Sequence, residues 1–196
     1  QLLTGGLLGG MVAGVFLLLQ SRGGGGGEWS GAPLPMGSSA PDFSLLAHGG
    51  RTVSLADFRG RVTVVFFGFT HCPDVCPTTL FEMTSLMQEL GPDADELEVY
   101  FVTVDPERDT EAVLGDYMQA FDPRFTALTG SRAEIDKVLK SYRVFSRKVD
   151  RDDGDYLMDH TATVFLFDSD AVFTSTIDYQ EDMDTALKKL RRLIDD

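Results

Sequence analysis

The feature that most constrains the fold of this chain is residues 62–69, an uncharged and almost wholly apolar run rich in valine and phenylalanine. Such a run offers no polar face to water, so it predicts a strand that is buried on both sides. Strands of this kind lie inside sheets whose two faces are covered by helices. The run therefore favours an α/β protein.

The patterns on either side of this run predict helices, further strands and two hairpins. Helices are expected at residues 78–90, 110–121, 131–142 and 182–193, strands at 99–104 and 125–128, and hairpins at 43–55 and 163–177. The third helix opens with Ser131 and Glu134, a capping-box pair. Helices between parallel-type strands, closed by a terminal hairpin and helix, predict a thioredoxin-like α/β fold, a central mixed β-sheet flanked by helices.

The N-terminal residues predict a transmembrane helix ahead of this domain. Residues 2–19 are largely apolar and almost uncharged, about the length that spans a bilayer, and no small-residue cleavage site follows. We expect a transmembrane anchor at 1–22, a flexible Gly/Ser/Pro-rich tether at 23–40 and one folded domain at 41–196. Glycines four residues apart, such as Gly5 and Gly9, either let the anchor dimerise or reflect the abundance of glycine in membrane helices.

Composition excludes one class of partner. The net charge is −14, and an acidic surface repels the phosphates of nucleic acid, so no nucleic-acid partner is expected. Hydrophobic residues make up 43% and charged residues 24% of the chain, which is typical of a globular protein. The acidic surface keeps the domain soluble beside a membrane and favours basic partner surfaces.

The chain has only two cysteines, and both follow the predicted central strand, in Cys72-Pro73-Asp74-Val75-Cys76. Where a strand passes into a helix, the helix dipole favours thiolates. If the stretch is already helical, a spacing of four places both sulfurs on one face. Two thiolates make a soft clamp suited to Cu(I), zinc or iron–sulfur. They are too few for an ordinary iron–sulfur cluster or a structural zinc site.

A metal held by two thiolates needs a third ligand, and the chain has three histidines. His48 lies in a predicted turn and is expected to be a solvated loop residue. His71 adjoins Cys72 but would point away from it on an extended segment. His160 precedes the strand predicted at 163–167, in the loop that faces the cysteines in a thioredoxin-type sheet. His160 is thus the best third ligand, and an ordinary loop histidine is the alternative interpretation.

Taken together, these residues resemble the Sco/SenC family of copper-assembly proteins for cytochrome c oxidase. The resemblance covers almost the whole chain from about residue 41. It rests on four segments: Leu55-Ala-Asp-Phe-Arg-Gly60, Phe66-Phe-Gly-Phe-Thr-His-Cys-Pro-Asp-Val-Cys-Pro-Thr78, Thr103-Val-Asp-Pro-Glu-Arg-Asp109 and Asp159-His160. A bare C-x-x-x-C is weak evidence, whereas this extended form with a downstream Asp-His is specific.

The resemblance implies a site, a cargo and partners. Cys72 and Cys76 are expected to bind copper and to cycle between dithiol and disulfide, and His160 to complete the site for Cu(I), or in some members Cu(II). The implied role is a metallochaperone that receives copper from a donor protein and serves the binuclear copper site of cytochrome c oxidase subunit II. The domain would face outward from the bacterial cytoplasmic membrane, or the intermembrane space from the mitochondrial inner membrane.

Three other interpretations of the cysteine pair stay open. The first is a membrane-anchored thiol–disulfide oxidoreductase that reduces the oxidase cysteines without carrying metal, although such enzymes normally use C-x-x-C and a proline before the facing strand. The second is a peroxidase of the peroxiredoxin kind, whose threonine spacing Thr70 and Cys72 do not match. The third is an anchored binding module with a structural disulfide, which would add little stability because the closed loop is so short.

Overall fold

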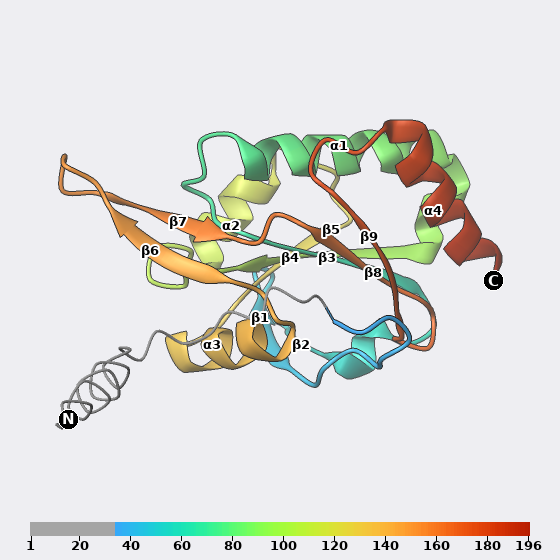
Figure 1. The fold of residues 1–196 in the computed structure, drawn as a ribbon, viewed down its shortest axis with the longest axis horizontal. Coiled ribbons are helices and arrows are strands. Elements are labelled where there is room, and N and C mark those ends of the chain that lie inside the picture. The colour runs from blue at the N-terminus through green and yellow to red at the C-terminus, as the bar shows by residue number, and fades with distance from the viewer. Residues whose placement is uncertain (1–33) are drawn as a thin grey trace, which may run out of the picture. The chain divides into compact units, whose positions relative to one another are not determined.

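A seven-stranded mixed sheet forms the centre of the domain in the computed structural model, which describes residues 34–196 (Figure 1). Its strands lie in the order β2-β1-β5-β4-β3-β8-β9. The three central strands run parallel: β3 (Val62–Gly68), β4 (Leu97–Thr103) and β5 (Phe125–Thr129). The outer strands are antiparallel to their neighbours: β1 (Ser44–Ala47), β2 (Thr52–Ser54), β8 (Val164–Phe167) and β9 (Phe173–Ile177).

Strand β3 has the environment that its sequence predicts. Each of its residues is buried, because β4 and β8 pair with it on either side and helices cover its faces. In Figure 1, α1 and α4 lie on one face of the sheet and α3 on the other. The helices are α1 (Val75–Leu90), α2 (Glu111–Met118), α3 (Arg132–Ser141) and α4 (Met183–Asp195), with short 3-10 turns at Leu55–Phe58 and Gly91–Glu96.

Local signals fix where the helices begin. The side chain of Ser131 accepts a hydrogen bond from the Glu134 N–H, and the Glu134 carboxylate accepts one from Ser131 N–H, which completes the predicted capping box. The side chains of Thr110 and Asp182 each accept one backbone N–H, from Val113 and Thr185, and so cap α2 and α4. The predicted helices and strands are therefore present, and together they form the mixed α/β fold of thioredoxin type.

One hairpin was not predicted. Strands β6 (Ser146–Asp150) and β7 (Tyr156–His160) pair antiparallel and form a separate two-stranded sheet. The prediction failed because none of their residues is fully buried and charged side chains interrupt the alternation expected of a strand. His160 is therefore the last residue of a strand and not part of the predicted loop.

The described end of the predicted tether is also part of the domain. Leu34 and Ala40 are buried, and the N–H of Ala40 donates to the carbonyl of Ala171. The Gly37 N–H donates to the carbonyl of Phe173 on β9, so residues 34–40 gain hydrogen bonds and apolar cover from the edge of the sheet. The predicted anchor and the rest of the tether lie outside the described residues. Within residues 34–196, no helix combines the length and apolar content of a membrane span.

Substitution of Gly68, the last residue of β3, tests the close packing that positions the cysteines. A Cβ there would lie 2.6 Å from Phe101 Cε2 and 2.9 Å from Cys76 Sγ. We expect Gly68→Ala to lower the free energy of unfolding by about 1–3 kcal/mol, as overpacking does in a close-packed core. Gly49→Ala is the matched control, because open space surrounds that position. Urea unfolding of the reduced chain measures both, and equal midpoints for the parent and Gly68→Ala would contradict the close packing.

Candidate metal centre

The two cysteines lie in the connection from β3 to α1 and in the first turn of α1, at the carboxyl edge of the parallel strands. Helix α1 begins at Val75, so Cys76 is in its first turn and Cys72 precedes it. The Cys72 N–H donates to the carbonyl of Phe69 at 3.2 Å, which turns the chain back over the strand. Cys76 is fully buried, whereas Cys72 is half-buried.

The two sulfurs lie on the same side of the start of α1, although residues 72–76 are not all helical, because α1 begins only at Val75. Cys72 Sγ accepts a hydrogen bond from the Cys76 N–H at 3.4 Å, as a capping side chain does at a helix N-terminus. The unpaired N–H groups of the first turn therefore favour negative charge on Cys72.

His160 approaches the same point from the end of β7. Its Nε2 lies 3.5 Å from Cys76 Sγ, and the three ligand atoms of Cys72, Cys76 and His160 all lie within 4.8 Å of one another. His160 Nδ1 lies 2.9 Å from the carbonyl oxygen of Thr161. A carbonyl can only accept, so Nδ1 carries the proton and Nε2 presents its lone pair to the sulfurs.

Two aromatic rings hold the imidazole in this position. Phe69 and Phe66 contact it edge-on, with ring centroids 5.7 Å and 6.5 Å away. Both phenylalanines are buried in β3 or just beyond it, so the ring rests on the core of the sheet. This apolar wall limits water on one side of the ligands and leaves the half-buried Cys72 on the open side.

The cysteines share one proton between them. The hydrogen bond that the Cys76 thiol donates to Cys72 lowers the pKa of Cys72 to about 4. Burial opposes this shift, and the backbone N–H groups of Cys76 and Asp74 add to it. The hydrogen bond that the Cys76 thiol donates to Cys72, the burial of Cys76 and the negative charge on Cys72 all raise the pKa of Cys76. At neutral pH the half-buried sulfur is thus a thiolate and the buried one a thiol, so the pair offers one charged, accessible sulfur.

The other histidines lie elsewhere. His71 is exposed, and its Nδ1 lies 3.0 Å from Thr70 Oγ1. His48 is half-buried, and its Nδ1 accepts a hydrogen bond from the Ala127 N–H at 3.1 Å. The expectation that His48 is a solvated loop residue was wrong, because its side chain is tied to the backbone of β5. Among residues 34–196, the cysteines and His160 are the metal-ligand cluster that the fold assembles.

Asp109 is a buried residue whose role sequence reasoning did not recognise. Its carboxylate accepts hydrogen bonds from Thr70 N–H at 3.1 Å, Thr70 Oγ1 at 2.6 Å and Thr103 Oγ1 at 2.6 Å. Burial raises the pKa of this carboxyl although these donors oppose the shift. Asp109 therefore ties the loop that carries Cys72 to the end of β4. Its place in the segment Thr103–Asp109 was the available signal.

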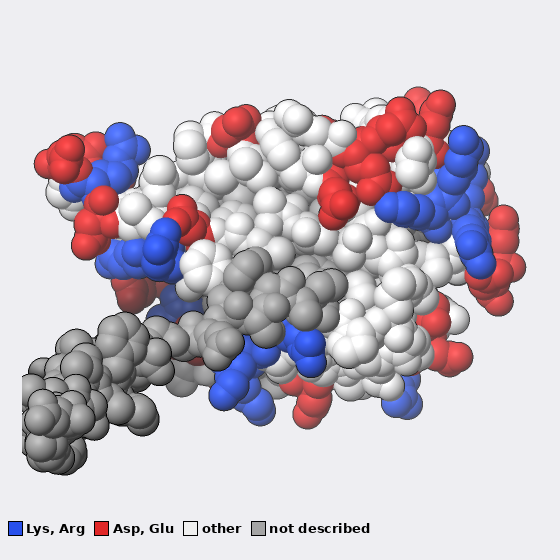
Figure 2. Space-filling model, viewed as in Figure 1, with Lys and Arg blue, Asp and Glu red and all other residues white. Residues whose placement is uncertain are grey.

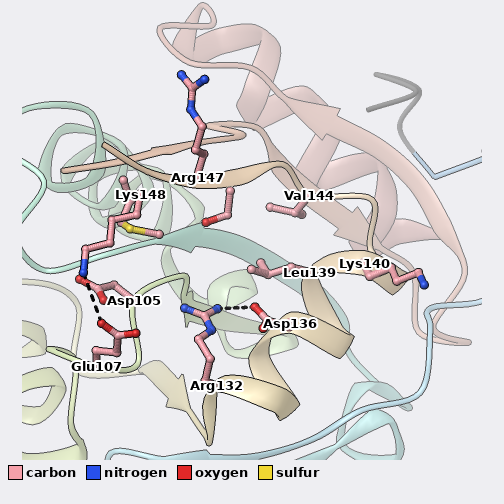
Figure 3. A pocket seen from close by; sticks show the side chains of 11 residues that line it. Asp105, Glu107, Arg132, Asp136, Leu139, Lys140, Val144, Arg147 and Lys148 are labelled. Carbon is pink, nitrogen blue, oxygen red and sulfur yellow. Dashed lines mark ion pairs between the residues drawn. The ribbon is translucent and has the colours of Figure 1, made fainter. Parts of the chain in front are cut away.

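A groove of about 440 Å³ lies beside the hairpin, between β6 and α3 (Figure 3). Charged side chains dominate its lining, with Arg132 paired to Asp136 and Lys148 to Glu107. None of the three ligand residues lines it.

Comparisons with known proteins give a consistent answer. The SCO1/SenC family model matches residues 33–195. The chain belongs to the SCO1/SenC family. Mitochondrial SCO2 of Bos taurus is 45% identical over 136 residues, 68% of this chain and 51% of the relative. The chain thus spans about half the length of that curated relative.

Solved structures agree with the fold. The copper-bound ScoI of Bradyrhizobium japonicum has a TM-score of 0.75 at 44% identity, covering 80% of this chain and 99% of the other. The copper-bound ScoI of Arabidopsis thaliana has a TM-score of 0.75 at 33% identity, covering 81% and 99%.

The proton sharing can be tested by titration of the reduced, metal-free SCO1/SenC chain. The thiolate of Cys72 is present above its pKa and is lost as pH falls, so thiolate absorbance should persist below neutral pH and disappear around pH 4. Removing the donor in Cys76→Ala should raise that midpoint toward the ordinary cysteine value of about 8.5. A midpoint near 8.5 in the parent would contradict the shared proton.

Proposed function

We propose that this SCO1/SenC protein is a copper metallochaperone, that it holds Cu(I) through Cys72, Cys76 and His160, and that it serves assembly of the copper site of cytochrome c oxidase. The observation that supports this most directly is the convergence of two sulfurs and an imidazole Nε2 within 4.8 Å. One sulfur is already a thiolate, and the tautomer of His160 leaves its Nε2 free to bind.

The donor set favours copper over the other soft-ligand metals. Two thiolates and one imidazole provide three ligands, whereas structural zinc takes four and an ordinary iron–sulfur cluster takes four cysteines. Some relatives agree, since the Bradyrhizobium and Arabidopsis ScoI structures carry copper. Cu(I) is the proposed cargo, and Cu(II) would use the same three residues.

The accessibility of the ligands suits transfer. Cys76 is buried, but Cys72 is half-buried at the surface, so an incoming thiolate can reach copper from its side. A partner ligand would add before Cys72 leaves, and the metal would pass without entering water. A site closed on all sides would not permit this exchange.

The surface around the cysteines suits a protein partner. On the face in Figure 2, charged side chains gather over the β6–β7 hairpin at one end and over α4 at the other, and the surface over the first half of α1 is largely uncharged. We propose that this surface meets oxidase subunit II and, in turn, a copper donor protein. Little charge has to be desolvated when such a surface is covered.

The proposed cellular setting follows from the oxidase. The domain would stand on the outer face of the bacterial cytoplasmic membrane, or face the mitochondrial intermembrane space, held by the anchor predicted at residues 1–22 and able to dimerise through its glycines. The relatives include mitochondrial proteins and a SCO2-like protein of Rickettsia felis.

A second candidate function uses the same cysteines to reduce a disulfide in the oxidase copper site. The low pKa of the accessible Cys72, with Cys76 beside it, favours this chemistry. The Cys72 thiolate would attack a partner disulfide and release one thiolate. Cys76, after losing its proton, would then attack Cys72 and release the second. The products are a Cys72–Cys76 disulfide and a reduced partner, a two-electron exchange.

Copper retention separates these functions. The reduced 196-residue chain, loaded anaerobically with Cu(I) and desalted, should retain about one copper per chain. Cys72→Ser, Cys76→Ser and His160→Ala should each weaken retention strongly, because each removes one of three ligands. His71→Ala is the control, as this neighbouring histidine lies outside the cluster.

Two results would overturn the copper assignment. A Cys72→Ser chain that holds copper as tightly as the parent would remove Cys72 from the site. A parent chain that retains no copper would leave the thiol–disulfide function, and its Cys72–Cys76 reduction potential would then be the quantity to measure.

A further inference from the structure

We infer that the segment Thr103–Asp109, which joins β4 to α2, is a bracket that positions both halves of the metal centre. We call this segment the bracket. Its Asp109 holds the loop of Cys72, and its Asp105 and Arg108 hold the hairpin that carries His160. The inference deepens the proposed function, on which its copper readout rests.

The cysteine side of the bracket is a buried carboxylate with three donors. Asp109 has no exposed surface, and two of its hydrogen bonds come from Thr70, two residues before Cys72. The third comes from Thr103, the last residue of β4. Because Thr70 is bound through both its backbone and its side chain, the position of the cysteine loop is fixed relative to the bracket.

The histidine side is a clamp on Tyr156, the first residue of β7. The Arg108 guanidinium carbon lies 3.6 Å from the centre of the Tyr156 ring, and Lys148 Nζ lies 3.7 Å from it. Arg108 also donates to the Tyr156 carbonyl at 3.1 Å and to Asp155 at 3.0 Å. The aromatic ring is thus held by a bracket cation and a hairpin cation, with further hydrogen bonds to the hairpin backbone.

Asp105 is buried and joins these contacts into one unit. It is 1% exposed, and it accepts hydrogen bonds from Arg108 Nε at 2.6 Å and from the Tyr156 hydroxyl at 3.0 Å. Its own N–H donates to Thr103 Oγ1 at 2.9 Å. Charge-assisted hydrogen bonds to a buried carboxylate are directional and strong, so this unit fixes the orientation of the hairpin relative to the bracket.

The register of β7 carries this constraint to the metal centre. Side chains two residues apart lie on the same face of a strand, so Tyr156, Met158 and His160 share a face. Pairing with β6 keeps β7 extended, with Asp150 opposite Tyr156 and Ser146 opposite His160. Contacts that hold Tyr156 in place therefore also set the position of the His160 side chain at the other end of β7. A slip of one residue would present Asp159 to the cysteines instead.

The hairpin depends on such docking. Strands β6 and β7 pair with each other and not with the seven-stranded sheet, and an isolated two-stranded hairpin is marginally stable in water. Figure 3 shows Lys148 extending from β6 to the bracket residue Glu107, whereas Arg147 extends away from the bracket. The ion pair between Lys148 Nζ and Glu107 Oε2 spans 3.7 Å and adds to the contacts that Arg108 and Asp105 make between the hairpin and the bracket.

A double-mutant cycle with His160 tests the inference. Cu(I) affinity is measured on the whole chain by competition with a chromophoric Cu(I) chelator. We expect Arg108→Met to weaken Cu(I) binding by about 10- to 100-fold, the usual effect of removing a group that orients a metal ligand. In a His160→Ala chain, the same change should weaken binding no further, because the ligand it positions is gone.

The matched control is Arg147→Met. It also removes one positive charge, but from a hairpin residue that pairs with Asp159 and not with the bracket. It should change Cu(I) affinity by less than about twofold. Equal weakening by Arg108→Met with and without His160 would overturn the inference, since the effect would not then pass through the histidine. A parent-like affinity in Arg108→Met would overturn it as well.

On the cysteine side, we expect a change that weakens Cu(I) binding to do so whether or not His160 is present. Thr70→Val removes the 2.6 Å hydrogen bond to Asp109 and disturbs the loop of Cys72. Its weakening of Cu(I) binding should persist in the His160→Ala chain, because the cysteines are still ligands there. Loss of that effect in the absence of His160 would contradict the division of the bracket into two sides.

Tyr156→Phe serves if Arg108→Met fails to fold, because it keeps the clamped ring and removes only the hydroxyl bonded to Asp105. It should weaken Cu(I) binding by about tenfold, again through His160.

Hydrogen exchange gives a readout without copper. Hairpin amides should exchange about tenfold faster than in the parent in Arg108→Met or Tyr156→Phe, and at the parent rate in Arg147→Met. A parent that binds no copper rejects the proposed function, and unchanged exchange in the bracket variants rejects the bracket.

Discussion

The arrangement of this domain depends on the complete burial of β3. A strand with no polar face has to be paired on both edges and covered on both faces, so β4, β8 and the helices take their places around it. Its carboxyl end is then a fixed point in the molecule. Gly68 allows Phe101 and Cys76 to approach the backbone closely, and the cysteine loop follows at once. The metal centre is therefore an extension of the core.

The centre itself combines one rigid ligand with two that are placed by hydrogen bonds. Cys76 is fixed by α1 and by its burial. Cys72 gains its low pKa from the Cys76 thiol and the open end of the helix, and His160 gains its tautomer from the carbonyl of Thr161. Binding copper thus requires the loss of the proton shared by the cysteines and little rearrangement of the imidazole. The same shared proton is what a thiol–disulfide exchange would use.

The expectations that proved right rest on strong local signals. The run at 62–69, the capping pair Ser131 and Glu134 and the terminal hairpin each predicted an element that the structure contains. The family resemblance, based on the extended cysteine motif and Asp159-His160, is confirmed by the family match. The features that were not predicted lie where the signal is weak or the partner is distant in sequence. The β6–β7 hairpin has no buried residue to mark it, and the packing of residues 34–40 depends on β9, more than a hundred residues away.

The sequence by itself determined the α/β class, the position of both cysteines at the end of a buried strand and the preference for a soft metal, because these depend on residue type and short spacing. It ranked His160 above His48 and His71 without deciding among them. Tertiary structure alone decided that β7 carries His160 to the sulfurs and that Asp105, Arg108 and Asp109 join the two sides. These are contacts between segments that are far apart along the chain, and their geometry exists only once the sheet has formed.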